Sequence, residues 1–468
     1  MKDFTLAEIA KACNGEYVGD ESLKNTKITS VERDSRQVNN GSLFLAIKGE
    51  RVDGHDFIEK CFAQGAVCAL CEKAPENATK PCIVVSSTLD AVKKIGRAYR
   101  EKFDIPVIGI SGSVGKTSTK EMLYAVLSQR FKTHKTQGNL NNELGVPLTL
   151  LSMPEDTEAA VIEMGISDFG EMTRLSEMVQ PTICVLTIIG ECHLENLGDR
   201  DGVLKAKTEM FKNACENADF ILNGDDDKLS TVKTVNGKKP VFFGLDAKND
   251  FYAKNIKNSG DGKVLATLCF DNNNIDVEIP AIGTYMVTNA LAAAAAGKLL
   301  GLTDEEIANG VASYKTVGSR ANVINTGKIK IIDDCYNANP TSVRASLDTL
   351  SNLDGRKVAI LGDMKELGSE ELKLHFDTGV YAKSKDIGTV ITVGELAKEL
   401  AKGADGKAFD TIEDAKSEIL KTIKSGDVVL VKASHSMQFE NIVEFLKQNL
   451  IYRKKMLTNQ KYSHIIVL

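Results

Sequence analysis

Short apolar runs alternate with longer amphipathic stretches along most of the chain. In the middle part, apolar runs at residues 107–110, 160–164, 183–188 and 220–223 are separated by segments long enough to form helices. Such runs, linked by helical stretches, are typical of parallel strands that are buried on both faces. The pattern predicts an α/β fold in which helices cover a parallel sheet.

The chain of 468 residues is too long for one ordinary core, so we expect several domains. The pattern divides it into a small N-terminal α/β domain over residues 1–87, a central domain over 88–315 and a C-terminal α/β domain over 316–450. Residues 451–468 are basic and then apolar, and the pattern assigns them no role.

Local signals add detail to this division. Thr5 and Glu8 have the spacing of a capping box at the start of a helix. Within the central domain, residues 251–280 alternate between apolar and polar and predict an antiparallel flap that turns around 259–262. Residues 290–300 are rich in alanine and predict a helix.

Composition and charge restrict the class of protein. Hydrophobic residues make up 43%, charged residues 26%, and the net charge is −6, so the basic footprint of a nucleic-acid binder is absent. No apolar run approaches the roughly 20 residues that cross a bilayer, and the first residues lack the apolar stretch of a secretory signal. We expect a cytoplasmic monomer that acts on small molecules, without nucleic-acid partners or membrane insertion.

The ten cysteines do not form a dense framework and are typical of reduced thiols. Cys68 and Cys71 have C-x-x-C spacing, with Cys61 and Cys82 nearby, which allows zinc binding or redox chemistry. The apolar run at 65–71 instead favours a buried strand, in which cysteine acts as a small hydrophobic residue. We favour the buried strand.

The strongest motif lies between the first central strand and the helix after it. It contains Gly112, Ser113, Val114, Gly115, Lys116, Thr117 and Ser118. Glycines let several backbone N–H groups point at one anion, and the helix N-terminus adds partial positive charge. Lys116 is placed to reach the β- and γ-phosphates, and the Thr117 hydroxyl to ligate Mg²⁺. Although the loop is shorter than the usual P-loop, we predict an ATP site.

Five further motifs follow this loop in the chain. They lie at residues 138–147, 163–165, 193–195, 334–340 and 362–368. Together with the loop they resemble the motifs of the Mur ligase family, in the same order. The resemblance covers nearly the whole chain, and the set is far more specific than any one member.

The resemblance implies an N-terminal domain for a UDP-sugar, a central P-loop ATPase and a C-terminal Rossmann-like domain. It is strongest to the branch that joins D-alanyl-D-alanine to a UDP-N-acetylmuramoyl tripeptide in peptidoglycan synthesis. Such ligases use ATP and Mg²⁺ to activate a carboxylate as an acyl phosphate before the amine attacks. The motifs leave open whether the third residue of the tripeptide is meso-diaminopimelate or lysine.

The resemblance also implies the metal ligands. It makes Glu163 and His193 ligands of Mg²⁺ beside Thr117, and we place His193 at the end of the third apolar run. The less favoured alternatives are that Glu163 is a solvated acid at a strand end and His193 a loop histidine. Imidazole is an unusual ligand for magnesium because of its softness.

Lys207 matches the lysine that Mur ligases carry as a carbamate, which would be a further ligand of Mg²⁺. Its spacing to Phe211 favours it over Lys205. The alternative is an unmodified lysine on a helix surface. With Lys116 and His193, Lys207 completes the predicted catalytic set.

For the nucleotide, the resemblance adds Asn289, Arg320 and Asp334. Asn289 lies just before the predicted alanine-rich helix, so a helix cap is the competing interpretation. Arg320 and Asp334 would close over the phosphate and the ribose. The family usually has a proline before this arginine, whereas residues 316–319 contain none.

For the UDP-muramoyl substrate, the resemblance points to two groups of polar residues. These are Ser35 and Arg36, with the segment 53–55, and Asn139, Asn141 and Asn142. The asparagines are equally compatible with a simple turn. Residues 432–436 depart from the family pattern, and we assign them no catalytic role.

Two other functions fit parts of this evidence. A sibling ligase could act on a different UDP-peptide, a folate or a polyamide, although the motifs at 138–147 and 362–368 argue against it. A non-catalytic nucleotide-binding protein could retain the fold, but Lys116, Glu163 and His193 are intact. The ligase is the hypothesis that we carry forward.

Overall fold

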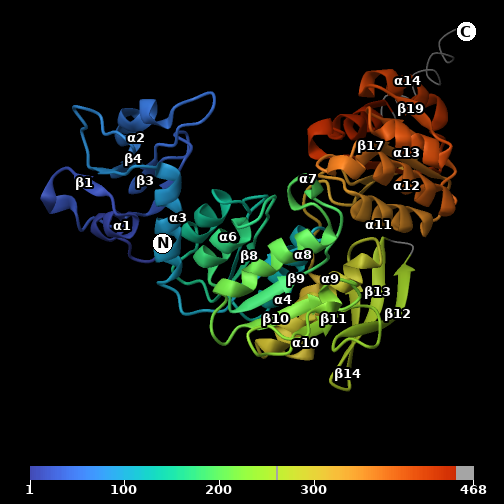
Figure 1. The fold of residues 1–468 in the computed structure, drawn as a ribbon, viewed down its shortest axis with the longest axis horizontal. Helices are drawn as coiled ribbons and strands as arrows, with labels where there is room; N and C mark the ends of the chain where they lie inside the picture. The colour runs from blue at the N-terminus through green and yellow to red at the C-terminus, as the bar shows by residue number, and fades with distance from the viewer. Residues whose placement is uncertain (260–261, 450–468) are drawn as a thin grey trace, which may run out of the picture.

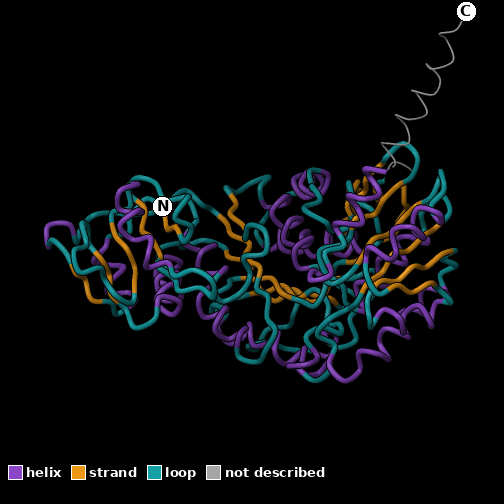
Figure 2. The backbone as a smooth tube through the Cα atoms, turned by 90° about the horizontal axis from the view of Figure 1, so that it is seen from above, coloured by secondary structure: helices purple, strands orange, loops and turns teal. Residues whose placement is uncertain are grey.

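The structure is a computed structural model that describes residues 1–259 and 262–449. Three lobes follow one another along the chain, and together they hold four sheets (Figure 1). Seen from above, the N-terminal lobe lies at one end of an elongated molecule (Figure 2). The predicted three-domain α/β architecture is confirmed. The tip of the predicted flap turn, at 260–261, and the tail from 451 lie outside the described residues.

The N-terminal lobe contains a five-stranded sheet in the order β1-β5-β4-β3-β2, with β1 antiparallel to β5 and the other pairs parallel. Its strands are β1 (Glu16–Val18), β2 (Ser30–Glu32), β3 (Ser42–Leu45), β4 (Cys68–Cys71) and β5 (Cys82–Val84). Its helices are α1 (Leu6–Cys13), which the predicted box of Thr5 and Glu8 caps, and α2 (Ile58–Gln64). The C-x-x-C segment is a buried strand with free thiols, as predicted.

Helix α3 (Thr88–Arg100) joins this lobe to the central one. The Tyr99 hydroxyl accepts a hydrogen bond from the Lys2 backbone at 2.7 Å and donates one to Met153 O at 2.9 Å. Arg100 donates to Val179 O at 2.9 Å. These buried bonds fix the N-terminal lobe against the central domain.

The central lobe is built on a six-stranded parallel sheet in the order β11-β10-β9-β6-β8-β7. The strands are β6 (Val107–Ser111), β7 (Thr133–Lys135), β8 (Ala159–Glu163), β9 (Ile183–Leu186), β10 (Asp219–Asn223) and β11 (Val241–Phe243). The four predicted strands are present. The sequence pattern missed β7 and β11, since each is only three residues long and lies at an edge.

Helices cover both faces of this sheet. Alternate strand residues pack against α4 (Lys116–Leu127), α9 (Tyr285–Leu299) and α10 (Asp304–Ala312) on one face. The others pack against α3, α5 (Gly145–Leu151), α6 (Glu171–Val179) and α8 (Arg200–Thr208) on the other face. This explains why the four inner strands, β6, β8, β9 and β10, are apolar along most of their length.

The predicted flap is confirmed as an antiparallel sheet of β12 (Tyr252–Ser259), β13 (Lys263–Phe270) and β14 (Asn273–Ile279). It packs against α9 and shares a core with that helix. Helix α9 begins at Tyr285 rather than at residue 290, with Thr284 at its N-cap, because Met286 and Val287 are buried against the same core.

The C-terminal lobe contains a six-stranded sheet in the order β15-β16-β20-β17-β18-β19, with β15 antiparallel to β16 and the other pairs parallel. Its strands are β15 (Asn322–Asn325), β16 (Lys330–Asp333), β17 (Lys357–Gly362), β18 (Thr389–Val393), β19 (Lys407–Phe409) and β20 (Val428–Lys432). Its helices are α11 (Pro340–Ser351), α12 (Glu371–Ser384), α13 (Ala397–Ala404) and α14 (Ile412–Thr422), followed by helical residues 440–449. The sequence pattern predicts four of these strands, at residues 329–332, 357–361, 389–393 and 428–431, and all four are present. It misses β15 and β19, which are edge strands.

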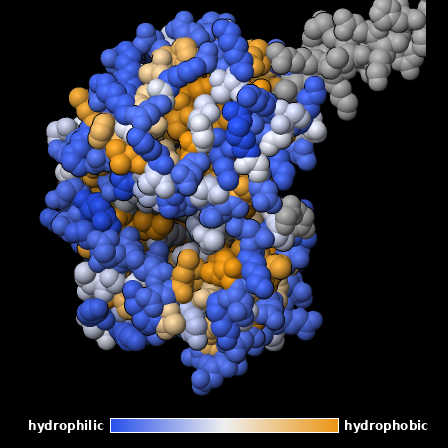
Figure 3. Space-filling model, turned by 90° about the vertical axis from the view of Figure 1, so that its right-hand side faces the viewer, coloured by the Kyte–Doolittle hydropathy of each residue, from blue (hydrophilic) through white to orange (hydrophobic). Residues whose placement is uncertain are grey.

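The C-terminal lobe faces the central lobe at the end of the molecule seen in Figure 3, where hydrophobic side chains are visible in the hollow between the two. Several side chains join these lobes. Thr341 at the start of α11 donates a hydrogen bond to Glu191 at 2.5 Å. No helix in the described part of the chain has the length and apolar character to cross a membrane.

Candidate active site

The glycine-rich loop connects β6 to α4 at the carboxyl edge of the central sheet, as predicted. Gly112 and Gly115 have φ angles of 148° and 86°, which favour glycine. A Cβ atom on Gly112 would lie 2.0 Å from Thr187 Oγ1. The same hydroxyl donates to Val114 O at 2.6 Å, so the residue that follows the neighbouring strand β9 fixes the loop.

Lys116 is the first residue of α4, and its ammonium returns over the loop to donate to Gly112 O at 2.6 Å. The side chain is half-buried, and no acidic residue lies in the first turn of the helix. Loop amides, a helix N-terminus and one ammonium group therefore converge at this point. This arrangement is suited to a polyphosphate.

Thr117 and Glu163 form a buried oxygen pair beside the loop. Glu163 ends β8, next to β6 in the sheet, and is 1% exposed. Thr117 Oγ1 lies 3.0 and 3.1 Å from the two carboxylate oxygens. A hydroxyl and a carboxylate are the hard ligands that Mg²⁺ prefers, so the donor set fits this ion. Because Glu163 is buried, the interpretation as a solvated acid is wrong.

His193 does not end a strand, contrary to the sequence prediction. Strand β9 ends at Leu186, and the chain then leaves the sheet because Ile188 accepts a hydrogen bond from Ser113 in the phosphate loop. His193 lies at the start of α7 (Leu194–Leu197) with a φ of 53°. Its Nδ1 is 2.6 Å from Glu366 Oε2 of the C-terminal lobe, but without hydrogen-bond alignment.

Lys207 is buried in α8 and is 1% exposed, so the interpretation as a surface lysine is wrong. Its pKa is lowered from 10.5 to about 8, mainly by burial; the charge of Lys116 acts in the same direction, against raising effects of Cys192 and Glu171. Lys205 instead extends over the exposed ring of Phe169 at 5.6 Å. Only a neutral amine reacts with carbon dioxide, and the lowered pKa of Lys207 increases that fraction near neutral pH.

Asn289 lies inside α9, so the helix-cap interpretation is wrong. Its Oδ1 accepts a hydrogen bond from Thr119 Oγ1 of α4 at 2.9 Å, and a Cβ atom on Gly115 would lie 3.6 Å from the same oxygen. The side chain therefore lies at the base of the phosphate loop.

Arg320 and Asp334 lie in the C-terminal lobe. The Arg320 guanidinium stacks on Tyr336, 3.6 Å from the ring centroid. Asp334 pairs with the buried ammonium of Lys432 at 2.6 Å and accepts a hydrogen bond from Ser346 at the same distance. Asp334 thus already has strong local partners.

Three comparisons bear on identity. The model of the Mur ligase middle domain matches residues 110–297, that of the Mur ligase glutamate ligase domain matches 319–435, and that of the Mur ligase family catalytic domain matches 27–111. The chain is 36% identical to the UDP-N-acetylmuramoyl-tripeptide–D-alanyl-D-alanine ligase of Bacillus subtilis (strain 168), over 94% of this chain and 98% of that protein. The chain belongs to the Mur ligase family.

Other relatives agree. The ligase of the same name from Escherichia coli (strain K12) is 34% identical, over 96% of this chain and 99% of that protein. A crystal structure of MurF from Acinetobacter baumannii has a TM-score of 0.89 at 32% identity, covering 96% of this chain and 99% of that chain. The MurF ligase from Thermotoga maritima, solved with ADP, has a TM-score of 0.82 at 30% identity, covering 91% and 98%. As a Mur ligase, the chain is an ATP-dependent ligase.

Among the expected substrate residues of this Mur ligase, only Asn141 contacts the buried oxygen pair of Thr117 and Glu163. Its amide donates to Glu163 Oε1 at 2.8 Å. Asn142 instead accepts hydrogen bonds from Leu144 N and Gly145 N at the start of α5, which supports the turn interpretation for that residue. Asn139 is exposed on the same loop.

Ser35 and Arg36 lie between β2 and β3 in the N-terminal lobe, and Figure 1 shows β3 and α4 in different lobes. Arg36 forms an ion pair with Asp34 at 2.6 Å and lowers the pKa of that carboxyl to about 2. In the segment 53–55, His55 Nε2 accepts a hydrogen bond from Glu72 N at 2.9 Å. Both groups belong to the loops of the first sheet.

Sequence reasoning missed a buried cation at this site. Lys120 of α4 is 0% exposed and lies 3.5 Å from Glu163. The residue comes three positions after Thr117, on the same face of the helix, and this spacing is the signal that could have identified it.

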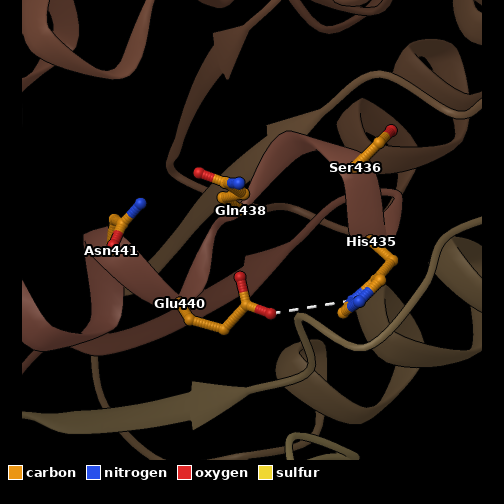
Figure 4. A pocket seen from close by; sticks show the side chains of 5 residues that line it. All are labelled: His435, Ser436, Gln438, Glu440 and Asn441. Carbon is orange, nitrogen blue, oxygen red and sulfur yellow. Dashed lines mark ion pairs between the residues drawn. The ribbon is translucent and has the colours of Figure 1, made fainter. Parts of the chain in front are cut away.

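Residues 432–436, to which we assigned no role, lead into a pocket of the C-terminal lobe (Figure 4). It is lined by His435, Ser436, Gln438, Glu440 and Asn441. The His435 ring lies 5.8 Å from Tyr336, on which Arg320 stacks. The pocket is thus linked to the predicted nucleotide residues through one aromatic ring.

Proposed function

We propose that this Mur ligase joins D-alanyl-D-alanine to a UDP-N-acetylmuramoyl tripeptide in the cytoplasmic stage of peptidoglycan synthesis. Sequence identities of 36% and 34%, over nearly the full length of two ligases of that name, support this pair of substrates. The single observation that carries the chemistry is the phosphate loop with Thr117 against Glu163 at the sheet edge. We further propose that the enzyme acts as a monomer on small molecules, without nucleic acid.

The reaction requires activation because a carboxylate and an amine do not condense in water. A carboxylate oxygen of the tripeptide attacks the γ-phosphorus of ATP, and ADP leaves. The amine of D-alanyl-D-alanine then attacks the acyl carbon, phosphate leaves, and the amine loses its proton. The loop amides and Lys116 stabilise the negative charge that two anions bring together, and the domains hold the reactants in position.

Magnesium would be held by Thr117, Glu163, His193 and Lys207, the last as a carbamate, and would neutralise the phosphate oxygens. Thr117 and Glu163 already form a hard pair, which supports this assignment. The burial and lowered pKa of Lys207 support the carbamate. Glu366 of the C-terminal lobe contacts Nδ1 of His193, so this histidine would ligate the ion through Nε2.

The substrates would be bound by residues from all three lobes. Asn289, Arg320 and Asp334 would contact the nucleotide together with the loop. Asn139, Asn141 and Asn142 would meet the muramoyl peptide, and Ser35 and Arg36 the UDP end. Placement of Asn141 against Glu163 supports a peptide carboxylate near the metal.

An assay of ADP release tests this function directly. Release should require ATP, the UDP-muramoyl tripeptide and D-alanyl-D-alanine together, with tripeptides that carry either diaminopimelate or lysine tried in parallel. Turnover with a single amino acid in place of D-alanyl-D-alanine, and none with the dipeptide, would assign the chain to a sibling activity. Binding of ATP without turnover of any pair would indicate a non-catalytic relative.

A further inference from the structure

Lys120 lies within α4, and its charge is completely withdrawn from solvent. An ammonium group in such a place costs several kcal/mol unless partners compensate it. Its Nζ lies 3.2 Å from Glu121 Oε1, 3.5 Å from Glu163 Oε2 and 3.5 Å from Gly138 O. The cation is therefore shared between a helix neighbour, the proposed metal ligand and the first residue of the loop 138–145.

Charges alternate along this buried row. Lys135 pairs with Glu121 on the side away from Glu163, and its ammonium also lies 4.0 Å above the Tyr124 ring. Glu121 is therefore neutralised from both sides, and Lys120 divides its attraction between two carboxylates. A tighter contact of Lys120 with any one partner weakens its hold on the others.

Asn141 provides a second link between the same loop and the same carboxylate. Its amide donates to Glu163 Oε1, whereas Lys120 approaches Oε2. A Cβ atom on Gly165 would lie 2.9 Å from Asn141 Cγ, so this side chain fits closely against the chain after β8. Each oxygen of Glu163 is thus occupied by a group that belongs to, or contacts, the loop 138–145.

We propose that Lys120 is a positioning residue that couples the substrate loop 138–145 to Mg²⁺ binding at Glu163. The inference rests on the proposed function, in which this loop meets the UDP-muramoyl peptide. A substrate that orders the loop holds Gly138 O against Lys120 and engages Asn141. Lys120 and Asn141 then move away from Glu163, whose oxygens become available to the ion. Each ligand therefore strengthens the binding of the other by the same factor.

Calorimetric titration of the full-length protein measures this factor. A non-hydrolysable ATP analogue with Mg²⁺ is titrated in the presence and absence of the UDP-muramoyl tripeptide, and the ratio of the two dissociation constants is the coupling factor. We expect about fivefold or more for the wild type, the lower end of typical couplings. In Lys120→Met the factor should fall close to one, while circular dichroism reports a folded protein.

Lys135→Met is the matched control, because it removes a lysine from the same row without touching Glu163 or the loop. Because Lys120 stays in place, Lys135→Met should keep most of the factor, even though Glu121 then attracts Lys120 more strongly. A purely structural role of the row would lower both affinities in both variants and leave the ratio unchanged. Retention of the factor in Lys120→Met overturns the proposal, and so does its equal loss in Lys135→Met.

Asn141→Ala carries the test if Lys120→Met does not fold, since Asn141 is a half-buried loop residue. Its coupling factor should also fall, and an unchanged factor overturns the proposal. Failure of the wild type to bind the tripeptide contradicts the proposed function. Binding of both ligands without mutual effect contradicts the coupling alone.

Discussion

The side chain of Lys116 is placed to bind phosphate and contributes little to the folded core. Its stem is half-buried and its ammonium donates to a backbone oxygen of its own loop, so it contributes no large apolar group to the core. The charge is available to a phosphate that enters the loop. The residue can therefore be removed with little effect on packing.

Lys116→Ala is expected to lose ADP release by about a hundredfold to a thousandfold, because one preorganised cation at the transferring phosphate is lost. Its thermal unfolding should remain within a few degrees of the wild type. Steady-state assays and a thermal melt check the two halves of this prediction. Wild-type turnover in the variant would show that the loop does not hold the triphosphate.

Lys207→Met is expected to stabilise the protein at pH 7 while abolishing activity. The folded pKa of about 8 lies below the usual 10.5, so the unmodified, protonated lysine opposes folding, by about 3 kcal/mol. This opposition should diminish as the pH rises from 8 towards 10.5. Denaturant titrations of both proteins in buffer freed of carbon dioxide measure the difference, and a destabilised variant would contradict the buried, unmodified amine.

At the scale of elements, a buried histidine fixes the loop after β17. His375 of α12 accepts a hydrogen bond from Met364 N at 2.9 Å through Nε2 and donates through Nδ1 to Glu371 O. Both ring nitrogens are used by the neutral form. Burial lowers the pKa of His375, against smaller raising effects of the Glu371 backbone oxygen and of Asp363 and Glu371 charges.

The C-terminal lobe should therefore lose stability as the pH falls below about 6.5, the unfolded value, since the unfolded chain then binds a proton that the folded ring resists. Above that pH the contribution is complete. His375→Gln should show a weaker fall over the same range. Urea denaturation at a series of pH values gives the comparison, and parallel curves for the two proteins would disprove the assignment.

Helices α12 and α13 approach closely through glycine. A Cβ atom on Gly379 would lie 2.0 Å from Leu400 O, a backbone atom that cannot move alone. Gly379→Ala should destabilise the protein by about 1–3 kcal/mol or more. Gly388→Ala is the control, because its nearest neighbour, Lys357 O, would be at an ordinary 3.7 Å. Equal melting temperatures for the two variants would contradict this packing.

Periodicity identified the elements that are long and buried, such as β6, β8 and the flap, because their apolar residues are required by the core. It missed short edge strands such as β7, whose residues are Thr, His and Lys. It also placed His193 on a strand, because nothing local reveals that the chain leaves the sheet to hold the phosphate loop. Lys120 was missed because its spacing to Thr117 gains meaning only once the fold places Glu163 beside α4.

At the scale of the whole molecule, the proposed chemistry requires groups from separate lobes. The phosphate loop and Glu163 belong to the central domain, whereas Arg320 and Asp334 belong to the C-terminal one. Contacts such as His193 with Glu366 and Thr341 with Glu191 hold these domains together in the present arrangement. The sequence predicted the three-domain architecture and the loop between β6 and α4, but the mutual placement of the lobes depends on these long-range pairs.

If the phosphate loop presents ATP to a substrate carboxylate, an oxygen atom of that carboxylate is transferred to the released phosphate, and ¹⁸O labelling detects this transfer. The UDP-muramoyl tripeptide is labelled with ¹⁸O in its terminal carboxylate and turned over with ATP and D-alanyl-D-alanine, and the released phosphate is analysed by mass spectrometry. We expect one ¹⁸O atom in each released phosphate, because the carboxylate oxygen stays bound to phosphorus when the amine displaces phosphate from the acyl carbon. Unlabelled phosphate, or label found in AMP, would contradict this expectation.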